Sequence, residues 1–185
     1  ASSYRPMAIL PAMSKILESL VAECLTTHLQ NLLPNTQFGF RPRRNSTAAI
    51  AYAHSAWSAA RREGKVIAVA AYDLSSAFDT VAFTILAVKL KRLGILGKEL
   101  AWFSDYLSAR RQRVSANGKL SSYRPVVYGV PQGSILGPIL FLAMVAELPA
   151  FLGAEEEDGG CVGYADDIVA WSCGKDMRSV KSKLE

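Results

Sequence analysis

The sequence predicts an α+β domain in which amphipathic helices pack against a sheet of short strands. The run 66–72 is uniformly apolar and of strand length, as expected for a strand in a sheet that is covered on both faces. A second apolar stretch, 161–171, is broken only by Ala-Asp-Asp at 165–167. Its β-branched and aromatic residues favour strands and the break has turn chemistry, so it predicts a β-hairpin with carboxylates at its tip.

Composition bounds the class of protein. The chain has 185 residues, of which 50% are hydrophobic and 20% charged, so it can bury a core and is not disordered as a whole. The net charge is +5, and arginine clusters fit a polyanion partner. Three cysteines without metal-type spacing indicate a reducing compartment, and no apolar run is long enough to span a bilayer. The arginine clusters are Arg41, Arg43 and Arg44, then Arg61 and Arg62, then Arg110, Arg111 and Arg113.

Local signals set the boundaries of the predicted elements. Pro34 ends the first helix, Asn45 caps the second, and Gly94 ends the third. Asn117-Gly118 is a strong signal for a tight turn between two strands. The predicted elements are, in order, helices at about 11–33 and 47–62, a strand at 66–72, a helix from Ser75 or Ser76 to Leu93, a helix at 98–109, a hairpin at 113–130, a helix at 135–148, the hairpin at 161–171 and a helix from 175 onward.

Three carboxylates are candidates for one site. Asp166 and Asp167 lie side by side at the predicted hairpin tip, where adjacent charges repel unless a counter-charge is near. A solvated acidic turn is one interpretation; a site for a hard cation such as Mg²⁺ is the other, and the apolar flanks favour it. Asp73, at the carboxyl end of the predicted strand, is either the N-cap of a following helix or the third acid of that site. A shared sheet would bring Asp73 beside Asp166, although 93 residues separate them.

Aromatic, amide and basic residues supply further candidates. Phe78 suits stacking under a sugar, although a Phe more often belongs to the core. The glycine-rich turn 130–137 enters a helix, whose free N–H groups attract phosphate, and Gln132 can hydrogen-bond a nucleotide; a plain strand-to-helix connection is the alternative. Asp79 is either a structural cap or the partner of an arginine. The basic candidates, each otherwise an ordinary solvated charge, are Arg5, Lys15, Arg41, Arg43 and Arg44.

Five sequence blocks resemble those of reverse transcriptases and occur in the same order. One block is weak evidence, whereas five in register over nearly the whole chain are specific. Their residues are most similar to those of the non-long-terminal-repeat, LINE-like retrotransposon branch, with group II intron enzymes as relatives. The blocks are Tyr4-Arg5-Pro6, Gln37-Phe-Gly-Phe-Arg41, Asp73-Leu-Ser-Ser-Ala-Phe-Asp-Thr-Val81, Gly129-Val-Pro-Gln-Gly-Ser-Ile-Leu-Gly-Pro-Ile-Leu-Phe141 and Tyr164-Ala-Asp-Asp167.

The resemblance implies a right-hand polymerase fold. A palm would contain a ferredoxin-like antiparallel sheet with helices on one face, next to partial and mostly helical fingers. The implied division is fingers at about 1–65, palm at 66–93 and 126–185, and a palm helix with a hairpin insertion at 94–125. The chain begins without Met, and we expect it to be a slice of a longer polyprotein that carries the thumb and an endonuclease.

The resemblance also assigns roles to the matching residues. Asp73, Asp166 and Asp167, with the backbone of Leu74, would bind two Mg²⁺ ions, for which Mn²⁺ can substitute. Phe78 would screen the sugar 2′ carbon and so favour deoxynucleotides. The residues implied near the incoming nucleotide are Arg5, Lys15, Arg41, Gln132 and Gly133, and those implied near nucleic acid are Arg43, Arg44 and Tyr164.

The implied activity is RNA-directed DNA polymerisation in retrotransposon replication. A primer 3′-hydroxyl would attack the α-phosphate of a deoxynucleoside triphosphate on an RNA template, by two-metal-ion chemistry. The expected partners are RNA template, DNA primer and deoxynucleotides, without a membrane, in a nuclear and cytoplasmic ribonucleoprotein. Two alternatives are an RNA-dependent RNA polymerase, which Phe78 disfavours, and a non-catalytic, maturase-like RNA-binding remnant.

Overall fold

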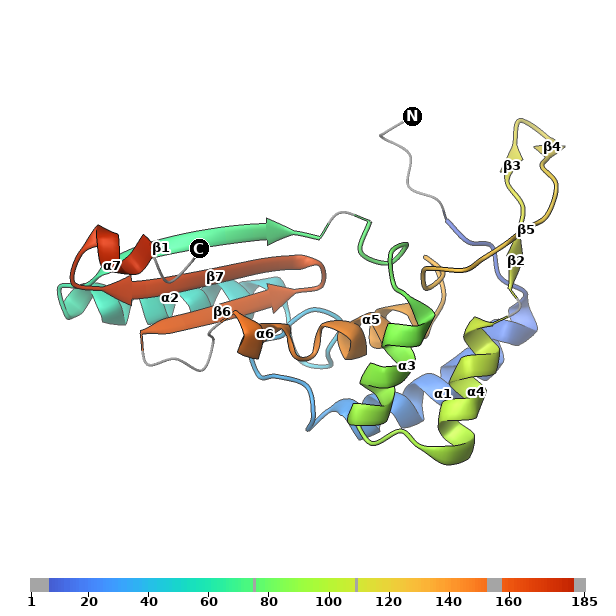
Figure 1. Ribbon diagram of the computed structural model, residues 1–185, viewed down its shortest axis with the longest axis horizontal. Coiled ribbons are helices and arrows are strands. Elements are labelled where there is room, and N and C mark those ends of the chain that lie inside the picture. The colour runs from blue at the N-terminus through green and yellow to red at the C-terminus, as the bar shows by residue number, and fades with distance from the viewer. Residues whose placement is uncertain (1–6, 75, 109, 153–157, 182–185) are drawn as a thin grey trace. The chain divides into compact units, whose positions relative to one another are not determined.

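The computed structural model describes residues 7–74, 76–108, 110–152 and 158–181, and the chain divides into two compact units (Figure 1). Unit 1 comprises Ala1–Leu29 and Ser76–Met144, and unit 2 comprises Gln30–Ser75 and Val145–Glu185. Each unit is therefore assembled from two segments that are distant in the sequence.

Unit 2 contains a three-stranded antiparallel sheet with helices packed on it (Figure 1). The strands are β1 (Val66–Asp73), β7 (Asp167–Gly174) and β6 (Gly159–Tyr164), in the spatial order β1-β7-β6. The helices are α2 (Ser46–Arg62), α6 (Leu148–Phe151) and α7 (Met177–Lys181). The predicted strand and the predicted hairpin are confirmed, and they share one sheet.

Small side chains let α2 lie close to the sheet. The ring of Trp171 in β7 meets the ring of Trp57 in α2 edge to face, with centroids 5.8 Å apart. The predicted cap is also confirmed, because the Asn45 side chain accepts a hydrogen bond from the Ala48 N–H at 2.8 Å and so satisfies an amide of the first turn. The buried residues of this core are Ala49, Ala53, Ala60, Val162, Trp171 and Cys173.

β1 lies at an edge of the described sheet, and most residues of its C-terminal half are exposed to solvent. Val69 is 49% exposed and Tyr72 is 40% exposed. The prediction that this strand is covered on both faces is therefore wrong.

β7 takes the central position because it pairs with β1 on one side and with β6 on the other. An apolar run predicts that a strand forms, but the partner strands decide which strand is central.

Unit 1 is mainly helical. Its helices are α1 (Ala12–Leu29), α3 (Phe83–Arg92), α4 (Gly97–Leu107) and α5 (Gly137–Val145). Two short strand pairs form one hairpin: β2 (Arg111–Gln112) pairs with β5 (Arg124–Pro125), and β3 (Ser115–Ala116) pairs with β4 (Lys119–Leu120). The predicted helices and hairpin are confirmed in outline, although the helix expected at 135–148 is interrupted after α5. The large buried side chains include Leu25, Leu29, Leu86, Leu90, Phe103, Leu107, Leu136, Leu140 and Phe141.

The helix predicted from Ser75 or Ser76 begins only at Phe83, and Ser75 lies outside the described residues. Ser76 has a φ of 56°, which lies outside the helical region. The carbonyl of Phe78 accepts a hydrogen bond from the Val130 N–H at 2.8 Å, so this segment is bonded to a distant part of the chain. A local periodicity of apolar residues does not contain that information.

A loop before α2 packs against the hairpin of unit 2 by backbone contact. The Phe38 N–H donates to the Gly163 carbonyl at 2.7 Å, and the Gly163 N–H donates to the Thr36 carbonyl at 2.9 Å. Gly39 then lies against the hairpin tip, where a Cβ would be 2.0 Å from the backbone nitrogen of Ala165. Only a residue without a side chain permits this approach.

A buried carboxylate supports the start of α5 in unit 1. Glu18 of α1 is 1% exposed. Its Oε2 accepts hydrogen bonds from the N–H groups of Ile135 at 2.7 Å and Leu136 at 3.4 Å, and its Oε1 accepts one from the Ser14 hydroxyl at 3.2 Å. Burial, and then the negative charge of Glu18, raise the pKa of Tyr106 to about 12. Glu18 thus satisfies amides of the glycine-rich turn that would otherwise be buried and unpaired.

Gly39→Ala should destabilise the protein by at least about 2 kcal/mol, because the new methyl group meets rigid backbone at the hairpin tip. Gly64→Ala is the matched control: Gly64 has a φ of 74°, and its added Cβ would have no neighbour within 4 Å. That variant should cost only the left-handed strain, about 1 kcal/mol. Urea unfolding of both variants measures the difference, and equal losses would contradict the contact at Gly39.

Glu18→Gln should lower the free energy of unfolding by about 1–3 kcal/mol, because two amides lose a charged acceptor in a buried site. Glu23→Gln, on the exposed side of the same helix, is the matched control and should change stability by less than about 0.5 kcal/mol. Thermal and urea unfolding supply the comparison. A Glu18→Gln protein as stable as the control would show that the carboxylate does not support the turn.

Candidate active site

The hairpin tip in unit 2 is a two-residue turn. Tyr164, the last residue of β6, pairs directly with Asp167, the first residue of β7. Ala165 and Asp166 form the connection, and Ala165 has a φ of 58°. Two-residue hairpin loops require a positive φ at their first central position, where glycine is usual. An alanine held in this conformation, and buried against the Gly39 loop, stores local strain at the tip.

Asp73 lies directly across from the hairpin tip. In the antiparallel register of β1 and β7, Asp73 pairs with Asp167, and the Leu74 N–H donates to the Asp166 carbonyl at 3.4 Å. Residues that pair directly across two antiparallel strands present their side chains on the same face. The predicted shared sheet is present, but Asp73 pairs with Asp167 and not with Asp166, which is contacted through the backbone of Leu74. The alternative role of Asp73 as a helix cap is wrong, because the next helix, α3, begins at Phe83.

The three carboxylates form a local concentration of negative charge. Asp73 and Asp167 are exposed and Asp166 is half-buried. None of them forms an ion pair with a residue in the described part of the chain. Within the same ranges, no three His, Cys, Asp or Glu side chains are already arranged around a metal position. Like charges repel, so without a cation the three carboxylates favour positions apart from one another. Their oxygens are the hard donors that Mg²⁺ binds. The donor set fits a divalent cation.

In unit 1, Phe78 and Gln132 are held by neighbouring side chains. The Phe78 ring stacks on Phe141 of α5, with centroids 5.0 Å apart. The Gln132 Nε2 donates a hydrogen bond to Asp79 Oδ2 at 2.9 Å, so Asp79 orients this amide and is neither a cap nor, in this contact, the partner of an arginine. Gly133 has a φ of 100°, which turns the chain sharply. The turn that carries Gln132 is thereby fixed from two sides.

The basic candidates fall into two groups. The Arg41 guanidinium donates to the carbonyls of Gln30 at 2.7 Å and Pro34 at 2.6 Å, and burial lowers the pKa of Arg41. Arg44 donates to the Asn35 and Gln37 carbonyls and lies over the Phe38 ring. Both side chains therefore hold the loop before α2. By contrast, Lys15 and Arg43 are exposed, and Arg5 lies outside the described residues.

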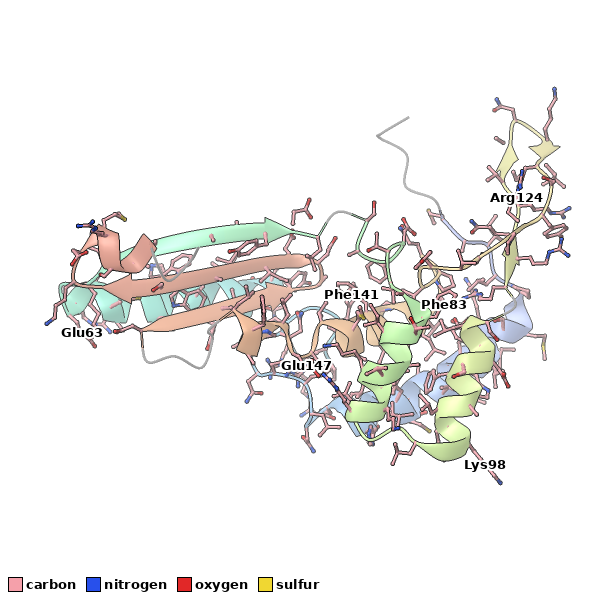
Figure 2. All side chains as sticks on the ribbon, viewed as in Figure 1. Glu63, Phe83, Lys98, Arg124, Phe141 and Glu147 are labelled. Carbon is pink, nitrogen blue, oxygen red and sulfur yellow. The ribbon has the colours of Figure 1, made fainter. Side chains whose placement is uncertain are left out.

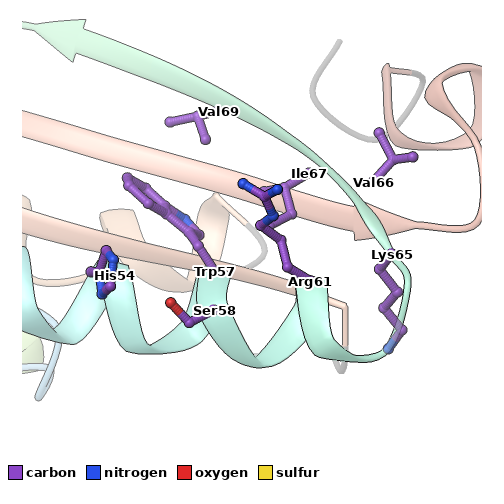
Figure 3. Close-up of a pocket in the computed structure, with 8 residues that line it drawn as sticks. All are labelled: His54, Trp57, Ser58, Arg61, Lys65, Val66, Ile67 and Val69. Atoms are coloured by element: carbon purple, nitrogen blue, oxygen red, sulfur yellow. The ribbon is translucent and has the colours of Figure 1, made fainter.

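A hollow of about 470 Å³ lies between α2 and the beginning of β1 (Figure 3). Its lining includes Trp57, Arg61 and Ile67. Val69 is the lining residue of β1 that is nearest to Asp73, and it lies four residues before it, roughly 13 Å away at the usual rise per residue. This hollow is therefore separate from the acidic tip.

Two supporting residues were not recognised as such in the sequence. Gly39 sits inside the Gln-Phe-Gly-Phe-Arg block, and a glycine between two aromatic residues is a signal of close backbone approach. Glu18 lies in an amphipathic helix that contains several other polar residues, and nothing in the sequence marks it as buried. In the described residues, no helix is both long and apolar enough to cross a bilayer.

Curated relatives resemble the chain along most of its length. The RNA-directed DNA polymerase from mobile element jockey of Drosophila melanogaster is 34% identical over 189 residues, which covers 99% of this chain and 20% of the relative. The probable RNA-directed DNA polymerase from transposon BS of the same species is 32% identical, covering 90% and 19%. The Pol polyprotein from retrotransposable element R2 of Popillia japonica is 29% identical, covering 91% and 25%. The chain spans about a fifth to a quarter of the length of these relatives.

Solved structures share the fold. Apo telomerase from Candida Tropicalis, truncated from its C-terminal domain, aligns with a TM-score of 0.64 at 11% identity, covering 92% of this chain and 36% of that one. Telomerase from Candida albicans in complex with a TWJ fragment of telomeric RNA aligns with a TM-score of 0.59 at 16% identity, covering 93% and 32%. At these identities the likeness concerns the fold alone.

The family comparison covers nearly every residue. The family described as "Reverse transcriptase (RNA-dependent DNA polymerase)" matches residues 1–184. This match includes all five blocks on which the resemblance rests, and the relatives from retrotransposable elements agree with it. The chain therefore belongs to the reverse transcriptase (RNA-dependent DNA polymerase) family.

Proposed function

We propose that this chain carries the polymerase active site of an RNA-directed DNA polymerase of a retrotransposon. The observation that supports this most directly is the β1–β7 register, which pairs Asp73 with Asp167 in a member of this family. Two acids from distant segments, paired at the end of a sheet, are a costly arrangement unless it serves a cation. The reaction is transfer of a deoxynucleotide to a primer 3′-hydroxyl, directed by an RNA template.

Asp73, Asp166 and Asp167 are the proposed ligands of two Mg²⁺ ions, with the Leu74 backbone beside them; Mn²⁺ has the same preference for oxygen. Such ions lower the pKa of the attacking hydroxyl and neutralise charge on the phosphates. The chain itself supplies position: the register sets the spacing of the acids, and the Gly39 loop braces the tip on which two of them lie. Rigid placement is what carboxylates in such a site require.

Further proposed roles concern residues that bind the nucleotide or the nucleic acid. Phe78, stacked on Phe141, would exclude a ribose 2′-hydroxyl, and Gln132 and Gly133 would line the nucleotide. Lys15 and Arg43 are exposed and available to phosphates, and Tyr164 is 40% exposed at the tip. Nucleotide or nucleic-acid contacts by Arg5, Arg41 and Arg44 stay predictions. In the language of the family, we propose fingers at about 1–65, palm at 66–93 and 126–185, and an insertion at 94–125.

Asp166→Asn should abolish primer extension on an RNA template, because loss of one ligand charge raises the barrier by several kcal/mol, roughly a thousandfold in rate. The fold should survive, since the carboxylate makes no ion pair among the described residues. Asp105→Asn, an exposed acid on α4, is the matched control and should extend primers normally. The measurement is single-nucleotide incorporation with Mg²⁺, with circular dichroism to verify folding. Wild-type rates from a folded Asp166→Asn protein would refute the proposed site.

Phe78→Val should relax sugar selection, because a smaller side chain leaves room for a 2′-hydroxyl. The ratio of kcat/KM for a deoxynucleotide over the matching ribonucleotide should fall by about 10-fold or more. Phe151→Val, at a side chain that is 86% exposed, controls for loss of a phenyl ring elsewhere. If ribonucleotides are incorporated readily by the unmodified protein, the RNA polymerase alternative is the better description.

A further inference from the structure

The hairpin at residues 110–128, here called the basic arm, concentrates the positive charge of the protein. The chain has 21 Lys and Arg and 16 Asp and Glu; the arm holds five of the basic residues and none of the acidic ones, so 16 of each lie outside it. The net charge of +5 therefore resides in the arm alone. A surface of one sign at this density attracts a polyanion.

The arm is a defined hairpin with a bulge. Asn117 and Gly118 have φ values of 49° and 72°, as a tight two-residue turn requires. The pairing shifts by one residue between the outer pair, Ser115 with Leu120, and the inner pair, Gln112 with Arg124. One strand thus contains an extra residue, which increases the twist and redirects the outer half of the arm.

The base of the arm joins the turn that bears the proposed nucleotide residues. The Val126 N–H donates to the Arg110 carbonyl at 2.8 Å, and Tyr128 forms an isolated bridge with Ala82. The next residue, Gly129, donates to the Val81 carbonyl at 2.8 Å. The arm is therefore anchored within unit 1, a few residues before Gln132.

Two arginines of the arm, Arg111 and Arg113, pack against the ring of Tyr123. The guanidinium carbons of Arg111 and Arg113 lie 5.4 and 4.9 Å from the centroid of the Tyr123 ring. Cation–π contact keeps both planar groups in place, while their N–H forks stay available for phosphate oxygens. Lys119 and Arg124 are exposed, and Figure 2 labels the side chain of Arg124. Among the described residues, none of these four forms an ion pair.

We propose that the basic arm binds the sugar–phosphate backbone of a nucleic-acid strand, independently of its sequence. The identification of that strand as template or primer rests on the proposed polymerase function. The Tyr123 ring already contacts two guanidinium groups, although it is 51% exposed, and this favours phosphate contact by the arginines over stacking of bases. The segment 111–117, which contains β2 and β3, spans at most about 20 Å, the length of roughly six nucleotides of one helical strand.

Exposed apolar side chains on the arm suggest a competing partner. Val114 is 65% exposed and Val127 is 64% exposed. A protein surface could cover them, but it would also have to neutralise five positive charges that have no acid within the arm. Charge therefore favours nucleic acid, and a protein partner is an outcome that the experiment must be able to return.

The test compares two variants that lose the same charge. The arm variant replaces four exposed residues by Gln: R111Q, R113Q, K119Q and R124Q. The control variant replaces four exposed basic residues outside the arm: R62Q, K91Q, K98Q and R178Q. All proteins, including the parent, also carry D166N and are assayed without nucleotides, so the result does not depend on polymerase activity.

Binding is measured by fluorescence anisotropy between about 50 and 200 mM salt with two labelled probes: a single-stranded RNA of mixed sequence and an RNA–DNA hybrid. Each lost phosphate contact lowers the slope of log K against log salt by about 0.7 for a single strand. The arm variant should therefore lose up to about 3 from the slope and bind on the order of 100-fold more weakly at 0.1 M salt. The loss of slope in the control variant should be at most about half of the loss in the arm variant.

A charge-preserving variant separates electrostatics from misfolding. R111K, R113K and R124K together keep the charge and should keep the salt slope of the parent to within about 0.7. Preference of the arm for one probe assigns it to the template or to the hybrid, and either result supports the proposal. Equal binding by the arm variant, the control and the parent overturns it and favours a protein partner. Loss of nucleic-acid binding by the Lys variant also overturns the proposal, because the charge of that variant is intact.

Discussion

The antiparallel register of β1 and β7 is the constraint on which the candidate site depends. It aligns eight residue pairs from Val66 with Gly174 to Asp73 with Asp167. The side-chain period of a strand is two, so a slip by one residue would move every side chain to the opposite face of the sheet. The buried contact of Trp171 with α2 would then be lost together with the pairing of the acids. Packing of an apolar core at one end thereby determines the position of charged residues at the other.

Two backbone contacts show how unfavourable local features are maintained. The hairpin tip keeps an alanine at positive φ because the loop with Gly39 packs directly on it. The start of α5 keeps buried amides because Glu18 reaches them from α1. Each feature costs free energy by itself and persists because the surrounding structure compensates for it. Both compensating residues lie outside the segments whose geometry they stabilise.

The acids of the hairpin tip and β1 and the basic residues of the arm lack partners of opposite charge among the described residues. The three acids have no basic partner in the described residues, and the basic arm contains no acid. Neutralising these charges internally would have been favourable for stability, since opposite charges attract at short range. Unpaired charge at each of these places, among the described residues, is what the proposed partners would require: a cation at the tip and a polyanion at the arm.

The sequence by itself determined the element types, the two hairpins with their turns, the Asn45 cap and the family, because each depends on residues that are close in the chain. Tertiary structure decided that β1 is an edge strand, that the helix expected from Ser75 or Ser76 starts at Phe83, and that Asp79 pairs with Gln132. It also decided that Arg41 and Arg44 hold a loop, whereas four basic residues of the arm form no ion pair among the described residues. The physical reason is that periodicity and turn chemistry act over a few residues, whereas strand order, buried charge and competition for hydrogen bonds depend on segments that meet only after folding.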